Sequence, residues 1–158
     1  MMADQMRLHA SCVCLEGCGI LIRGKPGSGK SDLALRLIDE PGYGGSGNLA
    51  RAELVADDQV EIRKSANTLV ASAPQTLAGL LEIRGLGIVR RANLEKASLA
   101  LVVDLDATAE RLPGFGEQTA SFLGVPLPIL YLPSALASAP ARVRAALAIL
   151  ANPALLRA

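Results

Sequence analysis

One short motif constrains this chain more than any other feature of its sequence. Residues 24–31 read Gly-Lys-Pro-Gly-Ser-Gly-Lys-Ser, which matches the phosphate-binding P-loop pattern of Gly, any four residues, Gly, Lys and Ser. The apolar run 19–23 predicts a strand before the loop, and apolar residues at helical spacing predict a helix over 30–39 after it. Because a P-loop joins a strand to a helix, these surroundings support the motif and predict an α/β domain that binds a nucleotide.

Each part of this motif has a chemical role in phosphate binding. The glycines let backbone N–H groups turn toward a phosphate without a Cβ clash, and the helix N-terminus adds partial positive charge. Lys30 would neutralise charge on the β- and γ-phosphates, and the Ser31 hydroxyl would bind Mg²⁺. The alternative is a glycine-rich turn that matches the pattern by chance. We assign nucleotide binding to the whole loop, that is Gly24, Lys25, Pro26, Gly27, Ser28, Gly29, Lys30 and Ser31.

A P-loop indicates the nucleotide but not the reaction, and two acidic sites could complete the chemistry. Asp104 ends the apolar run 99–104, as the Mg²⁺-binding Asp does in ordinary P-loop NTPases. Asp57 and Asp58 follow a shorter strand, and adjacent strand residues point to opposite faces, so only one of the pair is expected to face the phosphates. Two carboxylates close together also repel, which favours a general base at such a pair. These residues alone leave both acidic sites open.

Length and composition narrow the class of protein. The chain has 158 residues, 51% hydrophobic and 20% charged, so we expect one globular domain over 1–158. A net charge of +1 and 3% aromatic residues, with no Trp, disfavour nucleic acid as a partner. The N-terminus lacks a signal peptide's apolar segment, and no apolar run reaches the roughly 20 residues of a membrane span, which predicts a cytoplasmic protein without membrane contact. We expect the crowded cysteines to be small buried side chains, namely Cys12, Cys14 and Cys18.

The rest of the chain shows many short strands and few helices. Apolar runs bounded by turn residues predict further strands over 8–15, 53–56, 60–63, 68–71, 99–104 and 128–133. A helical turn is expected within 75–81, and the glycine-rich segment 41–50 predicts a flexible loop. A last helix is expected over 138–152, capped by Ser138, with a buried face formed by Val143, Ala146, Leu147 and Leu150. Such elements predict a mixed sheet with flanking helices.

Several segments, taken in order, resemble a known family. They are Leu-His at 8–9, the P-loop at 24–31, Leu-Val-Ala-Asp-Asp-Gln-Val-Glu-Ile-Arg at 54–63 and Leu-Glu-Ile-Arg-Gly-Leu-Gly-Ile at 81–88. Together they resemble the C-terminal catalytic domain of HPr kinase/phosphorylase, which phosphorylates a serine of the phosphocarrier protein HPr. The resemblance is good over about 8–90 and weaker to about 133. It implies the α/β P-loop fold of the HPr kinase and phosphoenolpyruvate carboxykinase type.

The resemblance also implies roles for single residues. The general base, which takes the serine proton and returns it in the reverse reaction, matches Asp58, so Asp104 becomes a strand-end residue. The Mg²⁺ ligands match Ser31 and Glu82. The catalytic residues of the family match His9, Lys30, Asp58, Arg84 and Arg111.

The implied function is an ATP- and Mg²⁺-dependent protein serine kinase acting on HPr or an HPr-like carrier, compatible with a homo-oligomer. A kinase of the same fold with another substrate, or a regulatory nucleotide-binding module without catalysis, are the alternatives. The presence of Lys30, Asp58 and Glu82 argues against the module, because a pure binder has no need of a base.

The chain also departs from the family pattern. Lys25-Pro26 replaces an acidic residue, and 132–136 stands where the family has Pro-Gly-Arg-Asn. No room precedes Leu8 for the family's N-terminal domain, so we expect a short form. The family's stretch supplies a cation that 132–136 lacks, so we expect weak or absent phosphorylase activity unless Arg142 or a neighbouring subunit supplies that charge.

Overall fold

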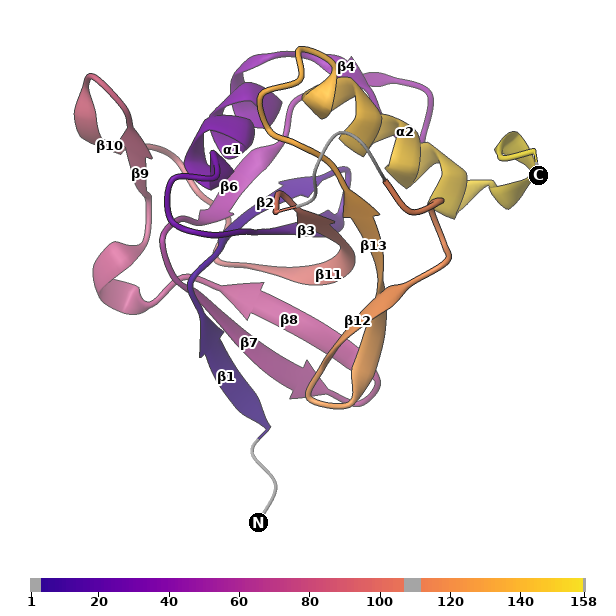
Figure 1. Cartoon of the computed structure of the whole chain (residues 1–158). Coiled ribbons are helices and arrows are strands. Elements are labelled where there is room, and N and C mark those ends of the chain that lie inside the picture. The colour runs from indigo at the N-terminus through magenta and orange to yellow at the C-terminus, as the bar shows by residue number, and fades with distance from the viewer. Residues whose placement is uncertain (1–3, 107–111, 158) are drawn as a thin grey trace.

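A curved mixed sheet organises the part of the chain that the structure describes. The computed structural model describes residues 4–106 and 112–157 (Figure 1). The strand order is β1-β7-β8-β11-β3-β2-β6, with β13 beside β11 and β12 beside β13. β3 and β13 run parallel to β11, whereas the other pairs are antiparallel, so the predicted mixed sheet is confirmed. The strands are β1 Gln5–Leu8, β2 Ser11–Leu15, β3 Cys18–Arg23, β6 Glu53–Ala56, β7 Val60–Ser65, β8 Thr68–Ser72, β11 Lys96–Asp104, β12 Thr119–Phe122 and β13 Val125–Tyr131.

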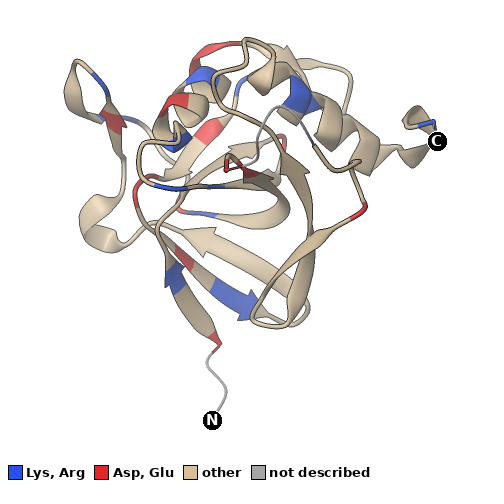
Figure 2. Ribbon diagram, in the orientation of Figure 1, with Lys and Arg blue, Asp and Glu red and all other residues tan. Residues whose placement is uncertain are grey.

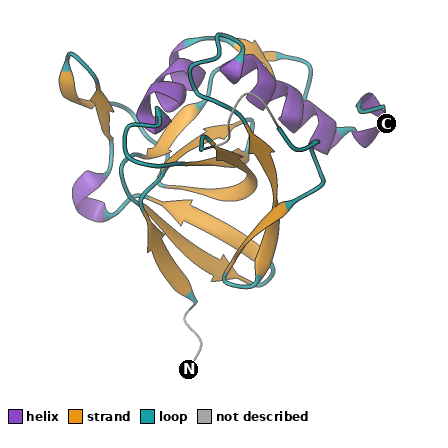
Figure 3. Cartoon of the chain, viewed as in Figure 1, coloured by secondary structure: helices purple, strands orange, loops and turns teal. Residues whose placement is uncertain are grey.

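Helices α1 (Lys30–Asp39) and α2 (Ala139–Ala151) cover one face of this sheet, as Figure 3 shows. Consecutive residues of β3 point to opposite faces, so Ile20 and Ile22 pack against the helices while Leu21 packs into a second core inside the curved sheet. Leu33 and Leu37, one turn apart on α1, are fully buried in the core between the helices and the sheet, together with Ile20 and Ile22. Burying a leucine contributes about 1.5–3 kcal/mol, so the helical spacing that predicted α1 also fixes it on the sheet.

Two regions of the main sheet differ from the prediction. The expected strand 8–15 is broken at His9 and Ala10, because β1 pairs with β7 whereas β2 pairs with β3 and β6. The strand β12, which forms a hairpin with β13, was not predicted. Its turn is made by Leu123 and Gly124, both with positive φ, and a leucine there gives no recognisable turn signal.

The other differences concern short elements. The segment 41–50, predicted as a loop, contains a small hairpin of β4 (Gly42–Tyr43) and β5 (Leu49–Ala50), whose strands are too short to show periodicity. The helical turn expected in 75–81 is a 3₁₀ turn at Gln75–Leu77. It is followed by a separate hairpin of β9 (Leu80–Ile83) and β10 (Gly87–Arg90).

The C-terminal helix differs from its prediction at both ends. The Ser138 hydroxyl caps no backbone N–H of α2; instead Arg142 Nε donates to it at 2.9 Å. Val143 and Leu147 are buried as predicted, but Leu150 is 39% exposed, because the last turn extends beyond the core. A 3₁₀ turn at Pro153–Leu155 follows.

The cysteines and charges fit a packed domain. Cys12 and Cys14 are buried in β2, where desolvation raises the pKa of both thiols, and Cys18 is half-buried. Basic and acidic residues are interspersed over the ribbon (Figure 2). Neither helix within 4–106 and 112–157 has the length and apolar character needed to cross a bilayer.

Candidate active site

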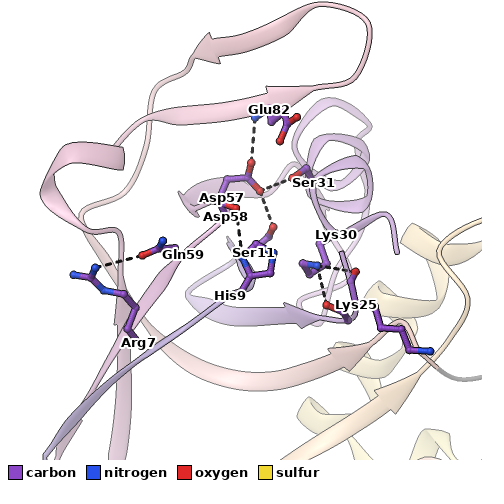
Figure 4. Close-up of polar contacts among 11 residues, drawn as sticks. Arg7, His9, Ser11, Lys25, Lys30, Ser31, Asp57, Asp58, Gln59 and Glu82 are labelled. Atoms are coloured by element: carbon purple, nitrogen blue, oxygen red, sulfur yellow. Dashed lines mark hydrogen bonds and ion pairs between the residues drawn. The ribbon is translucent and has the colours of Figure 1, made fainter. Parts of the chain in front are cut away.

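The P-loop adopts the predicted position between β3 and α1. Gly27 and Gly29 have φ of 83° and 96°, values that glycine reaches without steric cost, and the Ser28 N–H donates to the Lys25 carbonyl at 3.0 Å. Lys30 Nζ donates to the carbonyl oxygens of Gly24 at 2.8 Å and Lys25 at 3.0 Å. The ammonium group of Lys30 is therefore held within the loop, where a phosphate chain would lie (Figure 4).

Two loop glycines are required because other groups approach them closely. A Cβ on Gly24 would overlap the Ser28 hydroxyl and lie 3.2 Å from Cβ of Leu105. A Cβ on Gly29 would overlap the Ser134 hydroxyl and lie 2.9 Å from Cβ of Ser134. The loop is therefore packed against the segment that follows β13.

Gly29→Ala should raise the nucleotide dissociation constant by about tenfold or more, since even about 1.4 kcal/mol of clash with Ser134 corresponds to tenfold. Gly124→Ala is the matched control, because Gly124 has φ of 80° but nothing within 4 Å of a new Cβ. This control should lower the free energy of unfolding by about 1–2 kcal/mol without changing nucleotide affinity. Titration calorimetry with Mg²⁺-ADP and chemical denaturation measure both quantities. Equal affinities of the two variants would contradict the prediction.

Asp57 lies at the centre of the polar contacts (Figure 4). It is 3% exposed, and its Oδ1 accepts hydrogen bonds from the hydroxyls of Ser11 at 2.6 Å and Ser31 at 2.7 Å. Its Oδ2 accepts from the Glu82 N–H at 3.1 Å. One buried carboxylate thus joins β2, α1 and β9 at the P-loop serine.

The sequence predicts that one member of the acidic pair faces the phosphates, and Asp57 is the member that contacts Ser31. The contact of Ser11 with Asp57 was not predicted. A serine in the otherwise apolar run 11–15 was the available signal, because a buried hydroxyl needs a hydrogen-bond partner.

Asp58 is turned away from Asp57 and toward solvent. Its φ of 69° is left-handed, a conformation that Asp tolerates better than most residues. The Asp58 carboxylate lies 3.4 Å from Nδ1 of His9, and both side chains are more than half exposed. The fold therefore brings together the predicted base and the predicted histidine from two separate turns.

The remaining predicted residues lie at different distances from this centre. The backbone N–H of Glu82 donates to Asp57, the same carboxylate that Ser31 contacts. The side chain of Glu82 is exposed. Arg84 is exposed in the β9–β10 turn, and no hydrogen bond or ion pair joins it to the P-loop among the described residues. Arg111 lies outside the described residues.

The oxygen groups at this centre suit Mg²⁺. The described residues contain no cluster of three or more His, Cys, Asp and Glu side chains that could hold a metal on their own. Mg²⁺ needs no such cluster, because it keeps several waters and takes one or two carboxylates together with substrate phosphates. The hydroxyl of Ser31 and the carboxylate of Asp57 fit that preference, and the backbone of Glu82 lies next to them.

Asp104, the other candidate acid, ends β11, and both of its carboxylate oxygens accept hydrogen bonds from protein groups. Its Oδ2 accepts from Arg23 Nε at 2.8 Å, and its Oδ1 accepts from the Asp106 N–H at 2.9 Å. Asp106 in turn accepts from the Lys25 N–H at 2.9 Å. Asp104 therefore supports the P-loop from the end of β11, the position of a strand-end residue.

A pocket of about 330 Å³ opens beside the first residues of the loop. Its lining includes His9, Gly24, Lys25, Asp106 and Phe122. Larger hollows of about 680 and 490 Å³ contain none of the predicted site residues. The pocket next to His9 therefore borders the candidate site.

Comparison with known proteins agrees with the fold and the motifs. A family model described as the HPr Serine kinase C-terminal domain matches residues 1–146. The HPr kinase/phosphorylases of Lacticaseibacillus casei strain BL23 and Clostridium botulinum strain Eklund 17B are 37% and 35% identical over 84% of this chain. The chain spans only 42% and 44% of their lengths. The structure titled Hpr(Ser) kinase/phosphatase from Coxiella burnetii matches with a TM-score of 0.73 and 25% identity, over 95% of this chain and 97% of that one. On this evidence the chain belongs to the family of the HPr serine kinase C-terminal domain.

Proposed function

We propose that this protein is an ATP- and Mg²⁺-dependent serine kinase of the cytoplasm that phosphorylates HPr or an HPr-like phosphocarrier protein. The observation that carries the proposal is the meeting of the P-loop with the acidic pair, in which Asp57 contacts Ser31 and Asp58 faces solvent beside His9. A nucleotide-binding loop and an accessible base are the two parts that phosphoryl transfer to a hydroxyl requires.

Lys30 would exchange its hydrogen bonds to two loop carbonyls for hydrogen bonds to oxygens of the β- and γ-phosphates. The loop N–H groups would donate to the same phosphates. Ser31, Asp57 and Glu82 would hold Mg²⁺, which neutralises phosphate charge when bound. Asp58 would accept the proton of the acceptor serine as its oxygen bonds to the γ-phosphorus and the bond to the β-phosphate oxygen breaks, releasing ADP. His9 would orient the carboxylate of Asp58. Arg84 and Arg111 would add positive charge for the transferring phosphoryl group.

The openness of the base supports a protein acceptor. The side chains of His9 and Asp58 are 53% and 57% exposed, so the acceptor hydroxyl can arrive on the surface of a folded partner. An enzyme acting on a small metabolite commonly buries most of its substrate in a cleft.

The deciding experiment is incubation with γ-labelled ATP, Mg²⁺ and a purified HPr-like carrier. Label should appear on the carrier and disappear when its acceptor serine is replaced by alanine. Nucleotide binding without transfer would favour the regulatory module, and transfer to other proteins but not to the carrier would favour a kinase with another substrate.

The reverse reaction, attack of phosphate on phosphoserine with release of pyrophosphate, should be at least about tenfold slower than the forward one. A second anion beside a phosphoserine requires additional positive charge, because the two anions repel each other. The segment 132–136 offers no cation, the guanidinium group of Arg36 donates to backbone carbonyls, and Arg142 donates through Nε to Ser138. Serine-phosphorylated carrier with millimolar phosphate, followed by a pyrophosphate assay, tests this prediction. Equal rates in both directions would contradict it.

A further inference from the structure

The segment between β13 and α2, residues 132–138, runs from the end of β13 past α1 into α2 (Figure 1). The Leu132 N–H donates to the Asp104 carbonyl at 3.0 Å, and the Leu132 side chain is fully buried, which fixes the start of the segment. The Ser134 hydroxyl then donates a hydrogen bond to the Ser28 carbonyl inside the P-loop. We refer to residues 132–138 as the strap.

Arg36 of α1 holds the strap from the other side. Its Nη1 donates to the Ser134 carbonyl at 2.9 Å, and its Nη2 donates to the carbonyls of Leu136 at 2.9 Å and Ala137 at 3.3 Å. The Arg36 side chain is only 21% exposed, and its bonds to Ser134 and Leu136 are partly buried. The strap is thus bound to the helix that follows the P-loop as well as to the P-loop itself.

The geometry of the peptide unit gives the contact of Ser134 a consequence for phosphate binding. In a planar trans peptide, the C=O of Ser28 and the N–H of Gly29 point in opposite directions. A hydroxyl that holds the Ser28 carbonyl against the strap therefore holds the Gly29 N–H on the other side of the loop. P-loops bind phosphate through N–H groups aimed in this way, and a peptide flip would replace a donor with an acceptor.

We infer that Ser134 is a positioning residue for the P-loop, fixing the Ser28–Gly29 peptide in the orientation that binds phosphate. This inference rests on the proposed nucleotide-binding function. It goes beyond that function because it assigns a role to the strap, a segment in which this chain departs from its family. The absence of a side chain on Gly29 permits the contact, since a Cβ there would overlap the Ser134 hydroxyl. Arg36 supports the role by holding the Ser134 backbone in place.

The test compares Ser134→Ala with Ser138→Ala, which makes the same change in the same strap at a hydroxyl that contacts Arg142 instead of the P-loop. Ser134→Ala should raise the dissociation constant of Mg²⁺-ADP about threefold to tenfold, the loss expected for one hydrogen bond, while Ser138→Ala should leave it unchanged. With saturating ATP the turnover number should fall less than the affinity. Adding Arg36→Met to Ser134→Ala should cost less affinity than the sum of the two single changes, because both act through the strap.

Backbone NMR relaxation of the nucleotide-free protein provides a second readout. The ¹H–¹⁵N NOE of the Gly29 amide, which reports how rigidly this peptide is held, should fall in Ser134→Ala but not in Ser138→Ala, while the amides of α2 keep their wild-type values, which a general loss of stability would not reproduce. Unchanged ADP affinity together with an unchanged Gly29 NOE would overturn the inference. If the wild type itself fails to bind nucleotide, the proposed function fails, and the Gly29 NOE still decides whether Ser134 positions the loop.

Discussion

Lys30→Ala is expected to weaken binding of Mg²⁺-ADP by about 10-fold to 100-fold, the range for losing one or two hydrogen bonds from a charged donor. The reason is that Lys30 Nζ already lies inside the loop, between the carbonyls of Gly24 and Lys25. Titration calorimetry measures the affinity, and Lys96→Ala, at an exposed lysine of β11, is the control.

This variant should also be less stable than the wild type. Lys30 is only 7% exposed, and its ammonium group donates to two backbone carbonyls. Leaving those carbonyls without their donor should cost about 1–3 kcal/mol of unfolding free energy, measured by denaturation. ADP affinity equal to that of the wild type, in a folded variant, would show that the loop does not use this lysine.

Asp58→Asn is expected to lower the rate of transfer to the carrier by about 10²–10⁴-fold while nucleotide affinity stays within about twofold. Asparagine keeps the shape of the side chain but cannot take the serine proton. The side chain is more than half exposed and contacts His9 alone among the described residues, so the fold should survive. Single-turnover transfer of labelled phosphate to the carrier measures the effect.

Asp104→Asn provides the contrast for this prediction. It weakens the ion pair with Arg23 at the end of β11, so it should lower the free energy of unfolding and leave most of the transfer activity. If Asp104→Asn abolished transfer and Asp58→Asn did not, Asp104 at the end of β11 would be the acid that transfer requires. The protein would then work as an ordinary P-loop NTPase does, and the assignment of the base would be wrong.

Features carried by contiguous residues could be predicted from the sequence. The P-loop is one such feature, because its glycines, lysine and serine adopt their conformation within a single turn and lead directly into α1. The spacing of Leu33 and Leu37 placed the buried face of α1, and the apolar run 99–104 identified the buried part of β11. A mixed sheet followed from the many short strands. Family-specific residues at 54–63 and 81–88 identified the family itself, and the family comparison confirmed it.

The arrangement of the site depended on contacts between distant parts of the chain. Asp57 and Asp58 are neighbours in the sequence, but the left-handed turn at Asp58 sends one carboxylate to Ser31 and the other to His9. Alternation along a strand could not show which carboxylate contacts Ser31 and which contacts His9, because β6 ends at Ala56, before both residues. The same holds for Ser134, whose hydroxyl reaches the P-loop from the far end of the chain.

The sequence by itself therefore determined the P-loop, the helix it leads into and the family. Local hydrogen bonds and the periodic burial of apolar residues decide such features within one or two elements. Only the tertiary structure decided that Asp57 is the buried partner of Ser11, Ser31 and Glu82, and that Ser134 supports the loop. These contacts join residues that are far apart in the sequence, at separations that follow no periodic pattern. They form because the fold brings the elements that carry these residues together at the P-loop.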